Sequence, residues 1–222
     1  MDREVTMRPG ETRGATTNPT TRTLLACGAV AALLLPAVAV IQAVTRAGFD
    51  PRRHYMSQLS TGDLGGVQIA NFVVSGLLYV AFAVGIWRAL HPGRAGTWGP
   101  LLIGAYGVGL IAAGVFVPDP ANGFPAGTPA GAPSQMSWHS LMHGVAAIVS
   151  FLFLVAACFV FARRFAGLRQ RRWMVYCIVS GVICALLPAV PNPWPSLTLF
   201  AGGLVGWAWV FAIAVQLMKE RS

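Results

Sequence analysis

Six long apolar stretches constrain this chain more than any other feature. They cover Leu24–Val44, Val67–Leu90, Gly99–Val117, Leu141–Phe161, Trp173–Val190 and Leu197–Leu217. About 20 apolar residues in a helix are enough to cross the hydrocarbon core of a bilayer. Because helices of soluble proteins rarely stay uncharged for this length, the sequence predicts an integral membrane protein with six spans.

The spans are expected to be helices, since their apolar residues occupy every position and lack the alternation of a barrel strand. The third and sixth stretches carry glycines that let helices approach closely, namely Gly104, Gly107, Gly109, Gly202, Gly203 and Gly206. We therefore expect an all-α bundle of six transmembrane helices as one domain over residues 23–218. Its fourth helix should begin near residue 137. Residues 1–22 should form a disordered tail and residues 219–222 a short second one.

The basic residues predict how the helices are oriented. The chain has 16 Lys and Arg, and most of them fall in the two tails and in the second and fourth connections. These segments lie on one side of the membrane if six helices alternate, and the positive-inside rule assigns that side to the cytoplasm. Both termini should therefore be cytoplasmic, in a bacterial inner or plasma membrane. This topology and contact with anionic lipid explain the net charge of +9 without nucleic acid.

Three histidines are expected on the opposite, outer side, where they suggest a metal site. His139 and His143 are four residues apart at the start of the fourth helix, so both rings can reach a single ion. With His54 from the first outer connection they would provide the three protein ligands of a catalytic zinc site. The alternative is that His139 lies at the headgroup boundary and His143 makes an interhelical hydrogen bond.

Three further outer residues are candidates for catalysis. Asp119 or Asp63 could act as a general base, and the two prolines beside Asp119 hold its backbone extended. Ser57 follows His54 by three residues and could be a nucleophile or donate a hydrogen bond to a reaction intermediate.

Substrate binding is expected from arginines and amides near the same end. Arg46, Arg52 and Arg53 lie on the outer side against the positive-inside tendency, so they could bind the anionic end of a substrate. They could equally pair with the outer aspartates. Gln68 and Asn71 run down the second helix and either line a cavity or act as polar contacts between helices.

These outer connections resemble the bacterial and archaeal membrane family catalogued as domain of unknown function 998. The resemblance rests on Asp50-Pro51, His54, Ser57, Leu59-Ser60, Asn71-Phe72, Phe116, Asp119-Pro120, Gly123-Phe124-Pro125, His139 and His143, and it covers roughly residues 24 to 217. It implies six helices without an established activity. The polar set is also similar, more distantly, to that of alkaline ceramidases and adiponectin receptors, which implies zinc on His54, His139 and His143.

The residues together favour a metal-dependent membrane hydrolase that acts on a lipid or another amphipathic molecule. A copper protein is an alternative, because Met56, Met136 and Met142 lie beside the histidines. A haem protein is another, in which His54 with His139 or His143 would hold the haem between helices. A non-catalytic protein that binds or transports lipid or a small molecule is a further possibility. Proton-coupled transport is disfavoured, because no Asp, Glu, Lys, Arg or His stands in the deep middle of any span.

Overall fold

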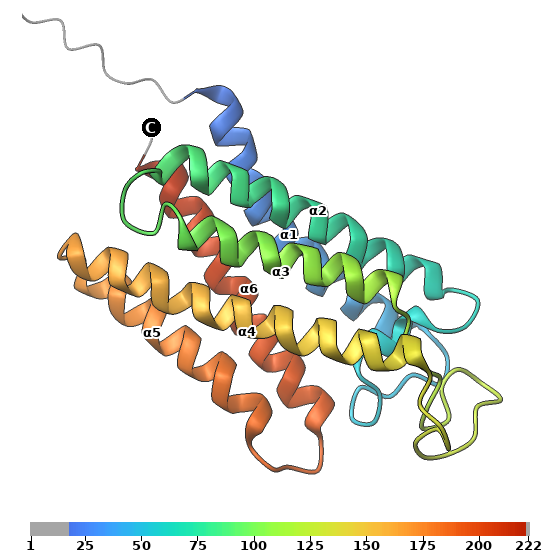
Figure 1. Ribbon diagram of the computed structural model, residues 1–222. Coiled ribbons are helices and arrows are strands. Elements are labelled where there is room, and N and C mark those ends of the chain that lie inside the picture. The colour runs from blue at the N-terminus through green and yellow to red at the C-terminus, as the bar shows by residue number, and fades with distance from the viewer. Residues whose placement is uncertain (1–17, 221–222) are drawn as a thin grey trace, which may run out of the picture.

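The computed structural model describes residues 18–220 and is built from six long helices (Figure 1). These are α1 (Pro19–Thr45), α2 (Gly65–Leu90), α3 (Trp98–Val115), α4 (Trp138–Gly167), α5 (Arg171–Leu186) and α6 (Pro195–Lys219), with short 3₁₀ segments η1 (Met56–Ser60) and η2 (Leu187–Ala189). Over these residues the chain forms no strand, and six helical segments are long and apolar enough to cross a membrane, the fifth continuing to Ala189. The prediction of an all-α bundle with six spans is confirmed.

The helices α1 and α4 extend furthest beyond their apolar stretches. The side chain of Asn18 accepts a hydrogen bond from the backbone N–H of Thr20, and Pro19 occupies the first helical position, so α1 starts ahead of its apolar run. Residues 19–22, which the sequence placed in the tail, are therefore helical, and residues 1–17 lie outside the described part. At its C-terminal end α4 continues past its apolar stretch to Gly167, because Phe165 is still fully buried in the core.

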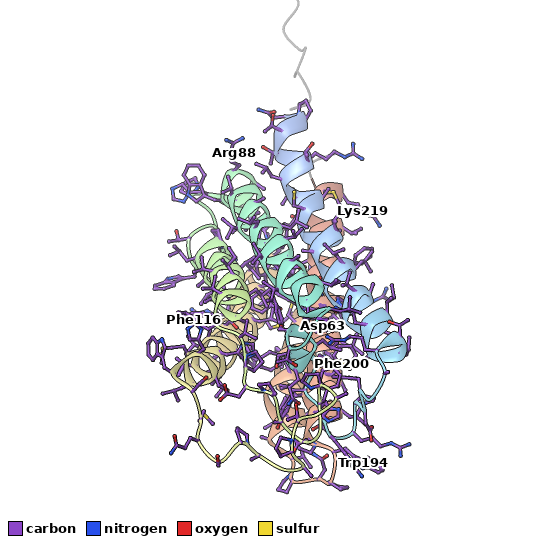
Figure 2. The ribbon with its side chains drawn as sticks, turned by 90° about the vertical axis from the view of Figure 1, so that its right-hand side faces the viewer. Asp63, Arg88, Phe116, Trp194, Phe200 and Lys219 are labelled. Atoms are coloured by element: carbon purple, nitrogen blue, oxygen red, sulfur yellow. The ribbon has the colours of Figure 1, made fainter. Side chains whose placement is uncertain are left out.

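Consecutive helices pack side by side, and α6 returns to contact α1, so the bundle closes into a ring. We call the end where α1 begins and α6 finishes the terminal end; it also holds the α2–α3 and α4–α5 connections. The opposite end, with the other three connections, is the loop end. In Figure 2, Arg88 and Lys219 lie at the terminal end and Trp194 at the loop end.

Glycines set how closely α2, α3, α4 and α6 approach. A Cβ atom added to Gly107 would lie 2.7 Å from the carbonyl oxygen of Gly76 on α2. One added to Gly109 would lie 2.3 Å from Cβ of Ser150, and one on Gly206 2.7 Å from Leu154. These distances leave no room for a side chain. The helices therefore approach closely at Gly107, Gly109 and Gly206, as the sequence predicted.

The centre of the ring is filled by large side chains such as Trp209, Tyr79 and Phe82, which are almost completely buried. The packing is less complete at the loop end between α4 and α6, which make few direct contacts. In Figure 1 these two helices diverge toward the loop end, and the α5–α6 connection lies apart from the other two. This divergence positions the cavity described next.

Candidate functional site

His143 lies on α4, buried against the end of α3. Its Nδ1 is 3.0 Å from the carbonyl oxygen of Ala113 and 2.8 Å from that of Phe116. Carbonyl oxygens only accept, so Nδ1 carries the hydrogen and donates it to the last turn of α3, whose carbonyls lack partners within the helix. The tautomer is thereby fixed, and Nε2 keeps a free lone pair. None of the described residues forms a hydrogen bond with Nε2.

The same imidazole lines an elongated cavity of about 320 Å³ among α2, α3, α4 and α6. Most of its wall is apolar, formed by side chains such as Leu110, Ala147 and Phe200. Ile148 and Leu152 of α4 also line it, yet they are 64% and 59% exposed at the surface of the bundle. The cavity therefore opens sideways between α4 and α6, on a face that the apolar composition places in lipid.

Polar groups gather at the loop end of this cavity. Ser57 in η1 and Ser196 at the start of α6 both line it, together with His143. Ser196 Oγ donates a hydrogen bond to the carbonyl oxygen of Pro51, which ties α6 to the α1–α2 connection. Toward the middle of the bundle, Trp207 Nε1 donates to the Tyr106 hydroxyl at 2.7 Å, so both polar atoms are paired there. The cavity is thus polar at one end and apolar along its length.

His54 faces away from this cavity. Its Nδ1 accepts a hydrogen bond from the backbone N–H of Asp50 (2.9 Å), so Nε2 carries the hydrogen and donates to the carbonyl oxygen of Asn122 (3.0 Å). The ring is buried, and the rings of Phe49 and Phe124 each lie 5.3 Å from it. Nδ1 therefore closes a contact within the α1–α2 connection, and Nε2 joins that connection to the α3–α4 connection.

Arg46 fixes the same region from the end of α1. Nη1 donates to the carbonyl oxygen of Leu59 (2.6 Å) and Nη2 to that of Thr61 (2.8 Å). The guanidinium carbon also lies 4.9 Å from the ring centre of Phe124, a cation–π arrangement. Partial burial lowers the pKa of this guanidinium and the charge of Asp63 opposes that shift, but arginine starts so high that it stays charged. Both terminal nitrogens of the guanidinium thus form hydrogen bonds within the loop end.

The two aspartates predicted as general bases both lie outside the cavity lining. Oδ2 of Asp119 accepts the backbone N–H of Ser137 at 2.7 Å, and the Asp119 N–H donates to Ser140 Oγ. Asp119 therefore holds the α3–α4 connection against the start of α4, where a carboxylate suits the helix dipole. Asp63 is exposed beside Arg46.

The remaining predicted substrate contacts are also outside the cavity. Gln68 accepts a hydrogen bond from Gln42 at 2.7 Å, and Asn71 donates to the carbonyl oxygen of Leu35, so both amides join α1 to α2. Arg52 and Arg53 are exposed on the α1–α2 connection, and Arg53 makes a long ion pair of 3.9 Å with Asp50.

The structure does not bring the three histidines together. His139 is exposed, and its ring lies 5.8 Å from the ring of Phe116. His143 forms its hydrogen bonds with the end of α3, and Nε2 of His54 donates to Asn122. Over residues 18–220 no group of three or more His, Cys, Asp or Glu is arranged to hold a metal ion. The expected three-histidine ligand set is therefore not formed by these residues. Zinc, copper and haem stay predictions, which elemental analysis and the visible absorption spectrum test.

Several cavity residues were missed in the sequence because they look like ordinary span residues. Tyr106, Phe200 and Trp207 stand in apolar stretches, and their spacing does not distinguish the wall of a cavity from a filled core. The one available signal was the pair of aromatic hydrogen-bonding groups in mid-span, since a buried tryptophan N–H usually finds a partner.

The fold and the cavity define a multi-pass membrane protein of six long helices, four of which, α2, α3, α4 and α6, line a laterally open, mostly apolar pocket. The family described as protein of unknown function (DUF998) matches residues 29–216, which is most of the chain. The chain belongs to the DUF998 family, as its motifs predicted. Comparison with the curated proteins and with the solved structures gives no match. The distant likeness to alkaline ceramidases and adiponectin receptors stays a prediction.

Proposed function

We propose that this protein binds an amphipathic, lipid-like molecule in the cavity between α3, α4 and α6. The observation that carries the proposal is the orientation of His143, whose Nδ1 is used on α3 while its ring lines a mostly apolar cavity. A pocket with mostly apolar walls and a few placed polar groups is the usual form of a small-molecule site.

The apolar part of the ligand would lie along the wall formed by Ala147, Ile148, Leu152 and Phe200. Burying apolar surface there gains little free energy relative to lipid, because the bilayer interior is equally apolar. Shape and the polar end therefore supply the selectivity. The exposed positions of Ile148 and Leu152 provide the route by which a molecule dissolved in the bilayer reaches the cavity.

The polar end of the ligand would lie at the loop end, near His143, Ser57 and Ser196. A neutral imidazole with its hydrogen on Nδ1 offers Nε2 as an acceptor, so it favours a ligand with a hydroxyl or amide hydrogen to donate. The distribution of basic residues assigns the loop end to the outer leaflet. The preferred ligand is therefore a hydroxyl- or amide-bearing lipid of that leaflet.

Hydrolysis of such a ligand is the second candidate, because Ser57 and His143 line the same cavity. In that reaction Nε2 of His143 would take the proton of the Ser57 hydroxyl as its oxygen attacks an acyl carbonyl, and would pass it to the leaving group, which leaves the acyl group on Ser57. A water molecule, giving its proton to the same Nε2, would then attack this ester, and the proton would return to Ser57 Oγ as the fatty acid is released. Replacement of Ser57 by alanine separates the two functions. Binding should survive this change, whereas release of a fatty acid should stop if the protein is a hydrolase.

Analysis of lipid that copurifies with the protein tests binding. Ala147→Trp should fill the cavity and lower the amount of the retained species several-fold relative to the unaltered protein. Val149→Trp is the matched control, since Val149 is 42% exposed on the same helix and is not part of the cavity lining. Equal lipid content and composition in both variants would contradict the proposal.

A further inference from the structure

A second cavity, at the terminal end, is independent of the proposed lipid site and is lined by arginines. Its volume is about 640 Å³, and its walls come from the α2–α3 connection, the start of α3 and the last turns of α4. Arg94 lines it from the connection, and Arg163 and Arg164 line it from α4. Its lining contains no carboxylate among the residues that the structure describes.

The positive charge of this cavity is largely uncompensated. Arg164 pairs with Glu220 at 2.8 Å and also donates to the carbonyl oxygen of Arg94, while its Nε is buried without a hydrogen-bond partner within the described region. Arg94 and Arg163 are exposed, and neither forms an ion pair with any residue from 18 to 220. Three like charges around one cavity repel each other, so an anion between them would be favoured.

The start of α3 adds to this preference. Thr97 and Trp98 line the cavity at the N-terminus of the helix, which has no side-chain cap and no acidic residue in its first turn. The positive end of the helix dipole therefore lies at the same space as the arginines. Together these groups match the requirements of a phosphate.

The shape of the cavity indicates a phosphate attached to a lipid. Gly167 has no side chain, and a Cβ atom there would lie 1.6 Å from Nη1 of Arg94, so the glycine lets this guanidinium lie across the end of α4. Val160 and Trp98 add apolar surface to the lining of the cavity, and Trp98 is 65% exposed. A tryptophan in such a position is typical of the membrane interface.

We infer that Arg94, Arg163 and Arg164 form a binding site for the phosphodiester of an anionic phospholipid. Arginine forks bind phosphate oxygens through paired hydrogen bonds, and basic pockets between helices on the cytoplasmic side recognise lipid headgroups. The basic residues place this end in the cytoplasmic leaflet, where anionic lipid is concentrated. Inorganic phosphate shares the same chemistry, so the test separates the two sources.

Native mass spectrometry of the purified full chain with added phosphatidylglycerol or phosphatidylcholine tests this inference. We expect tight retention of phosphatidylglycerol only, weakened about 25-fold in the Arg94→Gln/Arg163→Gln double variant, since each basic side chain near a membrane surface contributes about fivefold. Arg171→Gln/Arg172→Gln is the matched control, because it removes two charges from α5 at the same end. Thermal unfolding without lipid shows whether both variants are folded.

Three outcomes would overturn the inference. Equal losses in the cavity variant and the control would mean that general surface charge attracts the lipid. Equal retention of the two lipids would mean that the phosphatidylglycerol headgroup is not recognised. Displacement of phosphatidylglycerol by millimolar inorganic phosphate, with the same dependence on Arg94 and Arg163, would assign the site to a soluble phosphate instead of a lipid.

Discussion

The Nδ1 atom of His143 lies 2.8 Å from the carbonyl oxygen of Phe116, the residue at which α3 ends. The ring therefore has a structural role through Nδ1 and, in the proposed function, a role in recognition through Nε2, and substitutions can separate the two roles. His143→Ala should leave carbonyl groups of α3 without a donor and lower the free energy of unfolding by about 1–3 kcal/mol. His143→Asn can keep a donor near the position of Nδ1 but lacks Nε2.

We therefore expect His143→Asn to retain most of the stability and to lose selective lipid retention. Unfolding followed by tryptophan fluorescence, together with analysis of copurified lipid, checks both parts. A His143→Asn variant that holds its lipid as well as the unaltered protein would show that Nε2 has no part in recognition.

Close packing of α2 on α3 depends on Gly107. Gly107→Ala should lower the free energy of unfolding by about 1–3 kcal/mol, since the new Cβ would lie 2.7 Å from the carbonyl oxygen of Gly76 and the two helices would have to separate. Gly104→Ala is the control on the same helix, because its Cβ would meet Ala83 at an ordinary 3.4 Å. Thermal unfolding in detergent should separate the two variants. Equal stability would refute the packing account.

The loop end should depend on Arg46 far more than on Arg52. Arg46→Ala removes two charged hydrogen bonds to backbone carbonyls and a contact with Phe124, and should cost about 2–4 kcal/mol of stability. Arg52→Ala should change stability by less than about 0.5 kcal/mol, because its side chain is exposed. If Arg52→Ala destabilised the protein as much as Arg46→Ala, the assignment of Arg46 as the residue that holds this loop would be wrong.

Orientation in the membrane is open to a direct test. With both termini in the cytoplasm, a fluorescent protein fused after residue 222 should fold and fluoresce in a bacterial host. Alkaline phosphatase fused at the same place should be inactive, and it should be active when inserted in the α3–α4 connection near Ser134. The opposite pattern would reverse the bundle and move the arginine-lined cavity to the outer leaflet.

The helices could be predicted from the sequence because the length and apolar character of a span are local properties. Their ends were less predictable, since the start of α1 depends on a capping contact by Asn18. The family was also recognisable from motifs at the loop end, and the match over residues 29–216 confirms it.

The arrangement of the polar residues was harder to predict, because it depends on how the connections fold back. The spacing of His139 and His143 does place both near the end of α3. However, Nδ1 of His143 donates to backbone carbonyl groups there, and His139 is exposed. His54 is held by Asp50 in its own connection and by Asn122, whose positive φ of 57° turns the α3–α4 connection toward it. Such partners are backbone atoms, which carry no signature in the sequence.

Photo-crosslinking with a lipid that carries a diazirine on its acyl chain tests the central claim most directly. Mass spectrometry of the labelled peptides should find crosslinks concentrated on Ala147, Ile148, Leu199 and Phe200, which line the cavity. This labelling should fall in Ala147→Trp and persist in Val149→Trp. Labelling spread evenly over the exposed apolar faces of α1, α2 and α5, and unchanged in Ala147→Trp, would contradict a specific lipid site in this cavity.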